Sequence, residues 1–273
     1  MGTTGELNLF ARVGRHRGRL AVRAEEGGFT YGELLAASES VAAVLLDGAR
    51  DLEEMRVAFL VPPGYSYVKL QWGIWRAGGV TVPLCTSHPL AELEYVIRDA
   101  QAAVVVAAPE FAPVLRPLAT ALGLRFLASE ELPERAAAPL PQVDRGRRAM
   151  IVYTSGTTSR PKGVVTTHGN IEAQIESLVE AWEWCEEDRI LHVLPLRIAY
   201  SNLLSRWPRR VGYPSHRSDS YRGGSTAPRV GLPPTGLTQL HVALQNMNTT
   251  FRGRFPRFMA GPFAIRPAPP RTP

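Results

Sequence analysis

Apolar and polar residues alternate in two patterns along the first 130 positions of the chain. Short runs that are almost wholly apolar and end at turn residues are typical of strands buried on both faces. They occur at residues 56–61, 80–84, 102–107 and 124–127. Between them, apolar positions recur every three or four residues, as on the buried side of a helix. The alternation predicts an α/β fold in which helices cover a largely parallel sheet.

Several helical segments carry sequence signals for their ends. Thr30 and Glu33 have the spacing of a capping box, so a helix is expected to begin after Thr30 and to stop near Gly48. Residues 65–77 are predicted as a helix that ends at a pair of glycines. A third helix is expected to have Pro89 at its first position, followed by an apolar stripe at Leu93, Val96 and Ile97.

A second set of elements follows the fourth predicted strand. Residues 129–148 are rich in proline, glutamate and arginine and are predicted as a surface linker. Strands are expected at 150–153 and 164–166, and a helix from about His168. That helix places one group of apolar residues on a single side: Ile171, Ile175, Leu178, Val179 and Trp182. A last strand is expected at 189–194, after which the periodicity is lost.

The composition excludes several classes of protein. Of the 273 residues, 45% are hydrophobic and 21% are charged, which is close to the average for soluble globular proteins. No run of 18 apolar residues is present, so no transmembrane helix is expected. The two cysteines, Cys85 and Cys185, are too few for a disulfide framework or a zinc site and suit a reducing compartment.

Charge divides the chain at about residue 196. Residues 1–196 contain 19 basic and 24 acidic side chains. Residues 197–273 contain 12 arginines, no lysine and a single acid, Asp219. The difference predicts two regions, 1–196 and 197–273, that follow different compositional rules.

Residues 154–163 have the clearest chemistry in the chain. Five of the first six are hydroxylic, and the other is Gly156, which lets the backbone approach a ligand closely. Hydroxyls and successive backbone N–H groups form concave anion sites. Lys162 adds a positive charge on a long side chain, and Pro161 stiffens the return of the segment. These residues indicate a phosphate-binding hairpin between two strands; the alternative on residue types alone is an ordinary polar turn.

The segment differs from a Walker loop at two positions. Pro161 stands where that motif has its second glycine, and Gly163 follows Lys162 where the motif has Ser or Thr. Residues 153–164 instead resemble the AMP-binding signature of the acyl-adenylate-forming superfamily, which includes acyl-CoA synthetases, peptide-synthetase adenylation domains and luciferases. The one variation is Ser159, where many members have glycine.

Other segments resemble the superfamily at the expected intervals. They are residues 30–34, 76–84, 92–99 and 167–170. Residues 181–196 most resemble the malonyl-/methylmalonyl-CoA synthetase branch. The resemblance starts at about residue 8 and stops at Leu196.

The resemblance implies an ATP-dependent carboxylate–CoA ligase. A small-molecule carboxylic acid, malonate-like in this branch, displaces pyrophosphate from ATP to give an acyl-adenylate, and the thiol of coenzyme A then displaces AMP. Mg²⁺ bridges the phosphates. The implied phosphate-binding residues are Thr154, Ser155, Gly156, Thr157, Thr158 and Lys162. No catalytic or metal-ligating residue is assigned in this chain.

The chain departs from the superfamily after Leu196. The expected H-x-x-x-G segment, the adenine and ribose segments and the late catalytic lysine are not found in residues 197–273. We therefore expect residues 1–196 to be a partial N-terminal portion of the AMP-binding domain, and the chain as written to be inactive. The alternative is a non-catalytic phosphate- or nucleic-acid-binding protein that acts through its arginine-rich tail.

Three interpretations of residues 197–273 stay open. The segment is translation of a GC-rich gene in a shifted frame, a disordered basic tail, or an RNA-binding segment in which arginines alternate with aromatic residues. The break falls inside a recognisable motif, which favours the shifted frame over disorder, and disorder over nucleic-acid binding.

Location, association and isolated side chains give further expectations. The early start of the resemblance leaves no room for a cleavable presequence and favours a cytoplasmic protein without a membrane anchor.

Apolar strands that later segments would normally cover predict an exposed sheet edge and self-association through it. Residues 12–23 are predicted as an exposed basic helix face, and His168, His192 and Trp182 as structural residues.

Overall fold

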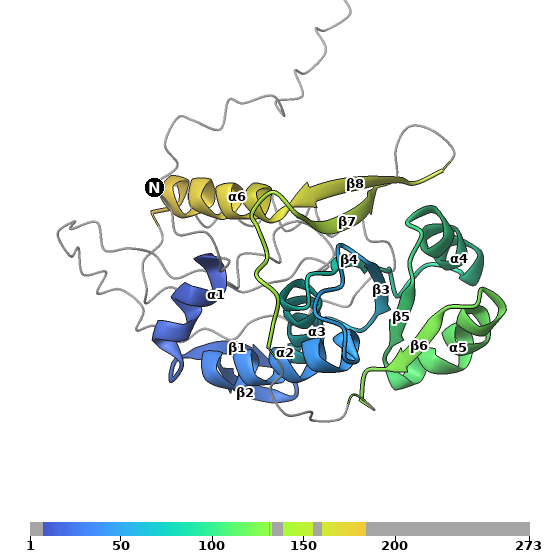
Figure 1. Ribbon diagram of the computed structural model, residues 1–273, viewed down its shortest axis with the longest axis horizontal. Coiled ribbons are helices and arrows are strands. Elements are labelled where there is room, and N and C mark those ends of the chain that lie inside the picture. The colour runs from blue at the N-terminus through green and yellow to red at the C-terminus, as the bar shows by residue number, and fades with distance from the viewer. Residues whose placement is uncertain (1–7, 131, 133–138, 155–159, 184–273) are drawn as a thin grey trace, which may run out of the picture. The chain divides into compact units, whose positions relative to one another are not determined.

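The computed structural model describes residues 8–130, 132, 139–154 and 160–183 (Figure 1). Its helices are α1 (Asn8–Val13), α2 (Tyr31–Leu46), α3 (Tyr65–Arg76), α4 (Leu90–Asp99), α5 (Ala112–Ala121), α6 (His168–Ala181) and the 3₁₀ turns η1 (Gly14–His16) and η2 (Pro109–Phe111). Its strands are β1 (Leu20–Ala24), β2 (Gly27–Thr30), β3 (Arg56–Leu60), β4 (Val80–Pro83), β5 (Val104–Ala107), β6 (Arg125–Ala128), β7 (Arg148–Thr154) and β8 (Lys162–Thr167). The predicted α/β fold is confirmed.

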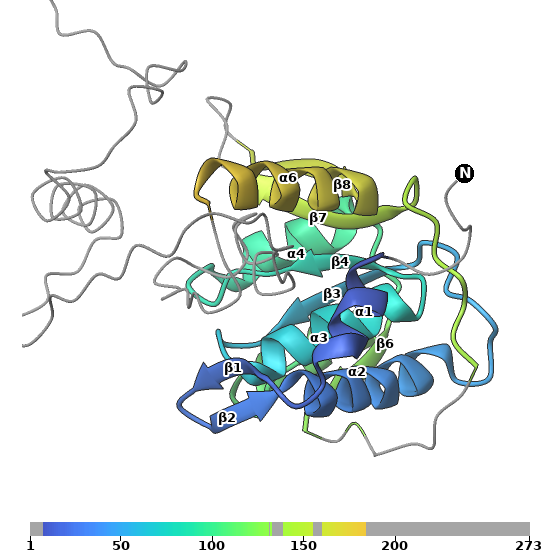
Figure 2. The same ribbon diagram turned by 90° about the vertical axis from the view of Figure 1, so that its left-hand side faces the viewer.

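Six strands form one sheet in the order β6-β5-β3-β4-β7-β8. β3 pairs in parallel with β4 and with β5, and β5 pairs in parallel with β6. β7 also joins β4 in parallel, through the pair Thr81 and Met150, and β8 returns antiparallel to β7. The sheet is therefore largely parallel, as predicted, with an antiparallel hairpin at one end. β1 and β2 form a separate two-stranded sheet (Figure 2).

Helices cover both faces of the parallel strands (Figure 1). Val57 and Phe59 of β3 point to the side where α2 and α3 pack. Ala58 and Leu60, which alternate with them, point to the side of α4 and α5. Because both faces of these strands are buried, most of their positions are apolar, which explains the nearly continuous apolar runs in the sequence.

Helices α3, α4 and α5 end in the same way. The second residue beyond each helix has a left-handed backbone, with φ of 80° at Gly78, 52° at Gln101 and 67° at Gly123. The following N–H then bonds back to the helix, as in the 2.9 Å bond from Gly79 to the carbonyl of Ile74. This Schellman arrangement satisfies two helix carbonyls and turns the chain back toward the sheet. In each case the next strand begins two or three residues after the left-handed residue.

Two capping boxes begin helices α2 and α6, whose buried residues meet in one core cluster. Thr30 and Glu33 cap α2, as the sequence predicts, and Thr167 and Asn170 cap α6 in the same reciprocal way. α2 ends at Leu46, slightly before the predicted stop at Gly48, because Asp47 already adopts a left-handed backbone with φ of 47°. Each box satisfies two N–H groups that the first helical turn cannot.

Four local predictions are wrong. Pro89 is the N-cap of α4 and not its first residue, because its ψ of 157° is extended. Residues 12–23 contain the end of α1, a 3₁₀ turn and most of β1, and do not form one helix. Residues 129–148 are not simply a surface linker, since Val143 is buried in the core. Trp182, predicted on the apolar side of the last helix, lies just beyond the end of α6 with 46% of its surface exposed.

No helix in the described part of the chain is both long and apolar enough to span a membrane. The predicted strand at 189–194, His192 and the region 197–273 lie outside the described residues. The division into 1–196 and 197–273 therefore stays a prediction.

Candidate functional site: the β7–β8 hairpin

The proposed phosphate-binding segment joins two antiparallel strands. The ladder between β7 and β8 runs from Arg148 opposite Thr167 to Thr154 opposite Lys162. Thr154 and Lys162 are the last pair before the connection, and both are exposed. Ser155, Gly156, Thr157 and Thr158 lie outside the described residues. The structure thus brings two of the six predicted site residues together.

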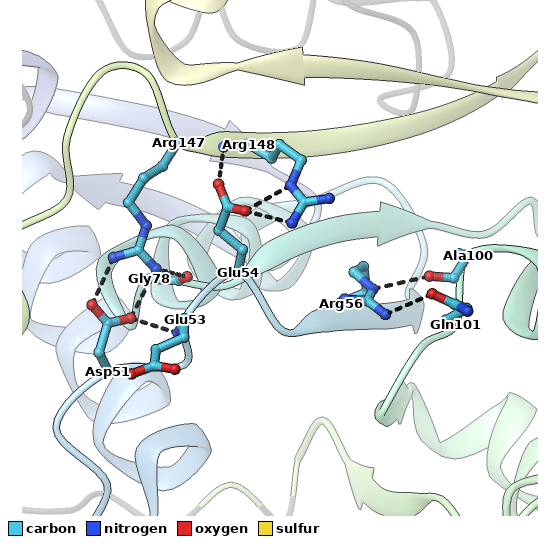
Figure 3. Close-up of polar contacts among 9 residues, drawn as sticks. All are labelled: Asp51, Glu53, Glu54, Arg56, Gly78, Ala100, Gln101, Arg147 and Arg148. Carbon is cyan, nitrogen blue, oxygen red and sulfur yellow. Dashed lines mark hydrogen bonds and ion pairs between the residues drawn. The ribbon is translucent and has the colours of Figure 1, made fainter.

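Two arginines attach the start of β7 to the rest of the fold (Figure 3). The Arg147 guanidinium donates to both carboxylate oxygens of Asp51, at 2.6 and 2.8 Å, and to the carbonyl of Gly78 at 2.6 Å. Arg148 donates to Glu54 from its backbone N–H and from Nε, each at 2.7 Å. Hydrogen bonds from Arg147 hold the pKa of Asp51 below its usual value, so this carboxylate stays charged.

Near the start of β7, side chains supplement the backbone pairing with β4. Its link to β4 is short, and the carbonyl of Ala149 instead accepts from the indole Nε1 of Trp75 at 2.8 Å and from Thr81 Oγ1 at 3.0 Å. All three residues are buried. Charge-assisted and buried bonds of this kind resist exchange with water, so they fix β7 against β4 and α3.

The far end of the hairpin contacts α4. Tyr153 donates from its hydroxyl to Asp99 Oδ2 at 2.6 Å, and Tyr95 donates to the carbonyl of Pro161 at 3.1 Å. The two tyrosine rings meet edge to face with centroids 6.4 Å apart. Burial, together with the hydrogen bond to Asp99, raises the pKa of Tyr153, so its hydroxyl stays protonated and remains a donor.

Gly163 is required by packing against β7. A Cβ at this position would lie 2.9 Å from Ile151 Cγ2 and 3.1 Å from Tyr153 Cζ. Gly163 is directly opposite Tyr153 in the ladder, so the tyrosine ring occupies the space that a side chain would need. The glycine that follows the lysine therefore allows the aromatic ring to reach α4.

His168 is the first residue of α6 and directly follows β8. It is buried, and its ring meets that of Trp75 edge to face with centroids 5.7 Å apart. Its Nε2 has no hydrogen-bond partner among the described residues. Burial, and then the nearby positive charge of Arg147, lowers the pKa of His168 to about 4. The ring is neutral at pH 7 and packs as an apolar group, in keeping with the structural role predicted for it.

The donors at the end of the hairpin fit a polyphosphate. Thr154 supplies a hydroxyl and Lys162 an ammonium group from facing positions, and neither group is buried in the core. A hydroxyl and a lysine are suited to phosphate oxygens, the lysine as a flexible point charge. The fit concerns anion chemistry only, because hydroxyl and ammonium groups do not select one nucleotide over another.

The AMP-binding enzyme family matches residues 9–208. The chain belongs to this family. It is 43% identical over 199 residues to malonate–CoA ligase ACSF3, mitochondrial, of Homo sapiens, and 41% identical over 201 residues to the corresponding protein of Xenopus laevis. Each match covers 69% of this chain, and 34% and 35% of the two relatives. The chain thus spans about a third of the length of these curated relatives.

Solved structures show the same fold. Apo MatB from Rhodopseudomonas palustris superimposes with a TM-score of 0.64 at 28% identity, over 74% of this chain and 44% of that one. VinN in complex with 3-methylaspartate gives a TM-score of 0.65 at 28% identity, over 74% of this chain and 59% of that one. The described architecture is therefore that of the N-terminal domain of adenylate-forming enzymes.

Sequence reasoning identified the hairpin but missed the residues that hold it. Asp51, Asp99 and Arg147 are charged residues in loops or at helix ends, and nothing local distinguishes them from solvated surface groups. Tyr95 fell inside a stretch that resembles the family, yet its apolar neighbours Leu93, Val96 and Ile97 accounted for the pattern. One signal was available, because an aromatic residue opposite a glycine across a predicted hairpin indicates a ring that crosses the strand.

Proposed function

We propose that this chain supplies the ATP-phosphate-binding part of a carboxylate–CoA ligase that acts on a malonate-like acid. The observation that carries the proposal is the pairing of Thr154 with Lys162 at the open end of a hairpin whose base is fixed by buried and charged bonds. Family membership and the malonate–CoA ligases among the relatives support the reaction class.

The proposed role of the hairpin is electrostatic. In the first step a carboxylate oxygen bonds to the α-phosphorus of ATP, and the bond to pyrophosphate breaks. Thr154 and Lys162 would hold the β- and γ-phosphates, together with Ser155, Gly156, Thr157 and Thr158, so that the leaving pyrophosphate is oriented and its charge is offset. Bound Mg²⁺ supplies further charge neutralisation on the phosphates. In the second step the thiol of coenzyme A bonds to the acyl carbon and AMP leaves.

Lys162→Ala should weaken binding of inorganic tripolyphosphate to the purified chain by about 10-fold or more, since a charge-assisted contact contributes roughly 1.5–3 kcal/mol. Tripolyphosphate is the appropriate probe because it tests the phosphate site without the nucleoside. Isothermal titration calorimetry gives the dissociation constant directly. Lys69→Ala is the matched control, because Lys69 is the only other lysine in the sequence and lies on α3.

Equal affinities for the two lysine variants would contradict the proposed phosphate site. We also expect no malonate-dependent release of pyrophosphate from ATP by this chain, because the adenine, ribose and late lysine segments were not found in the sequence. Pyrophosphate release that Lys162→Ala abolishes would show instead that the chain is active as written.

Self-association through β8 is a second part of the proposal. In the part of the sheet that the structure describes, β8 has a neighbour on one side only, and Val164 and Val165 are each about half exposed. An exposed strand with unpaired N–H and C=O groups and apolar side chains is a template for pairing with another copy. Sedimentation of the chain at increasing concentration should therefore show a dimer or larger species.

Val165→Lys should shift that equilibrium toward monomer, because a lysine on an edge strand opposes edge-to-edge pairing. Val114→Lys is the control, since Val114 is similarly exposed, at 46%, but lies on α5. A wild-type chain that stays monomeric at all concentrations would overturn this part of the proposal.

The cytoplasmic location expected from the sequence stays a prediction, and several of the relatives are described as mitochondrial.

A further inference from the structure

We propose that α4 holds the phosphate-binding hairpin in position, and that Tyr95 and Asp99 are positioning residues for Thr154 and Lys162. The inference rests on the proposed function, because it assigns a role to residues that hold the hairpin and do not themselves contact phosphate.

The outgoing strand is held by Asp99. Tyr153 directly precedes Thr154, and its hydroxyl donates to Asp99 Oδ2 at 2.6 Å. Its ring lies over Gly163 of the facing strand, so it spans the hairpin before it reaches α4. A shift of Tyr153 would therefore move Thr154 through one peptide unit and would also release the ring from β8.

The returning strand is held by Tyr95. Its hydroxyl donates to the carbonyl of Pro161, which directly precedes Lys162, at 3.1 Å. The guanidinium of Arg160 lies over the same ring, 5.6 Å from its centroid. One aromatic side chain thus contacts two successive residues just before the lysine, by a hydrogen bond and by a cation–π contact.

Both attachment points belong to one rigid element. Tyr95 and Asp99 are four residues apart and therefore lie on the same face of α4, one turn from each other. The opposite side of α4 is fixed in the core through buried Leu93, Val96 and Ile97. The edge-to-face contact between Tyr95 and Tyr153 links the two attachments to each other. A single helix consequently sets the positions of both ends of the connection.

Positioning of this kind has a consequence for affinity. A phosphate site made by facing strands binds well only when its donors are already in place, because ordering them on binding lowers affinity. Loss of either tyrosine hydroxyl leaves Thr154 and Lys162 chemically intact but less well placed. The expected effect is a weaker phosphate site without loss of the fold.

The test compares Tyr95→Phe and Tyr153→Phe with Tyr65→Phe in the full chain. Tyr65 is the matched control, because its hydroxyl also donates to a backbone carbonyl, that of Glu33 at 3.3 Å, but it lies at the start of α3 away from the hairpin. We expect the first two variants to bind tripolyphosphate about 3- to 10-fold more weakly and the control to bind like wild type. Hydrogen exchange of the backbone amides of residues 162–166 should be faster in the first two variants only.

A carboxylate series separates positioning from general stability. Asp99→Asn keeps an oxygen that can accept from Tyr153, whereas Asp99→Ala does not, so the asparagine variant should retain affinity and slow exchange while the alanine variant loses both. Wild-type affinity in both tyrosine variants together with wild-type exchange would overturn the inference. Faster exchange with unchanged affinity for tripolyphosphate would show that α4 supports the hairpin without affecting the phosphate site. That result would also overturn the inference.

Failure of the proposed function gives a different result. If the wild-type chain does not bind tripolyphosphate, the phosphate site is wrong and the positioning role falls with it. The exchange measurement then still shows whether α4 holds the hairpin, since it does not depend on any ligand.

Discussion

Gly78→Ala is expected to destabilise the protein by roughly 4 kcal/mol or more, which approaches the entire stability of many domains. Gly78 has a φ of +80°, where an alanine is strained by roughly 1–2 kcal/mol. A Cβ there would lie 2.2 Å from Asp51 Oδ1 and 2.9 Å from Arg147 Nη2. It would therefore separate the paired carboxylate and guanidinium, which are both partly buried, and each charged hydrogen bond contributes roughly 1.5–3 kcal/mol.

Gly123→Ala is the matched control for this prediction. Gly123 occupies the same position after α5 that Gly78 occupies after α3, with a φ of +67°, and a Cβ there would meet no atom within 4 Å. Gly123→Ala should lower the free energy of unfolding by roughly 1–2 kcal/mol, from backbone strain alone. Urea unfolding of the two variants measures the difference. Equal losses would show that the Arg147–Asp51 pair does not hold β7 in place.

Acidification from pH 6.5 to pH 4 is expected to lower the free energy of unfolding by about 3 kcal/mol through His168. Its pKa is about 4 in the folded protein, below the ordinary value of 6.5 that applies after unfolding. In this window the unfolded chain binds the proton more readily, so stability falls as the pH falls, at up to about 1.4 kcal/mol per pH unit. Above pH 6.5, where His168 is neutral in both states, its contribution to stability is fully present.

His168→Phe should flatten the pH dependence in this window, since a phenyl ring can pack on Trp75 without binding a proton. His88→Phe is the control for removing a histidine outside the core, because the His88 side chain is partly exposed beside Glu92. Asp51 contributes to the pH dependence of stability at lower pH than His168 does. Its pKa is depressed, so its stabilisation is lost only below the ordinary carboxyl value of about 4. A wild-type protein with constant stability between pH 6.5 and pH 4 would refute the assignment to His168.

Local sequence patterns predicted most elements of the large sheet and its helices, although they missed β1 and β2. The apolar run that became β3 predicts a strand buried on both faces, because a strand between two helical layers has no polar side. The capping box at Thr30 and Glu33 predicts the start of α2, because both of its hydrogen bonds lie within one helical turn. Information of this kind depends on residues close in sequence, and so it can be recovered from sequence alone.

The same patterns failed where distant residues decide the outcome. Residues 129–148 appeared to be a surface linker because they are polar, yet Arg147 forms a bidentate ion pair with Asp51, which lies 96 residues earlier. Trp182 follows the apolar spacing of α6 but lies one residue beyond its end and is half exposed. Periodicity reports which side chains share a face, but not whether another element covers that face.

By itself, the sequence determined the α/β class, the largely parallel strands and the hairpin, and it predicted which hydroxyl and lysine side chains would bind phosphate. These follow from local periodicity, from capping and from the chemistry of residues 154–163. Only the tertiary structure showed that Thr154 faces Lys162 in register, and that Tyr95 and Asp99 of α4 hold the two strands that carry them. Such contacts join residues 54 and 66 positions apart, and they form only after parallel strands and their helices have packed, which no local pattern records.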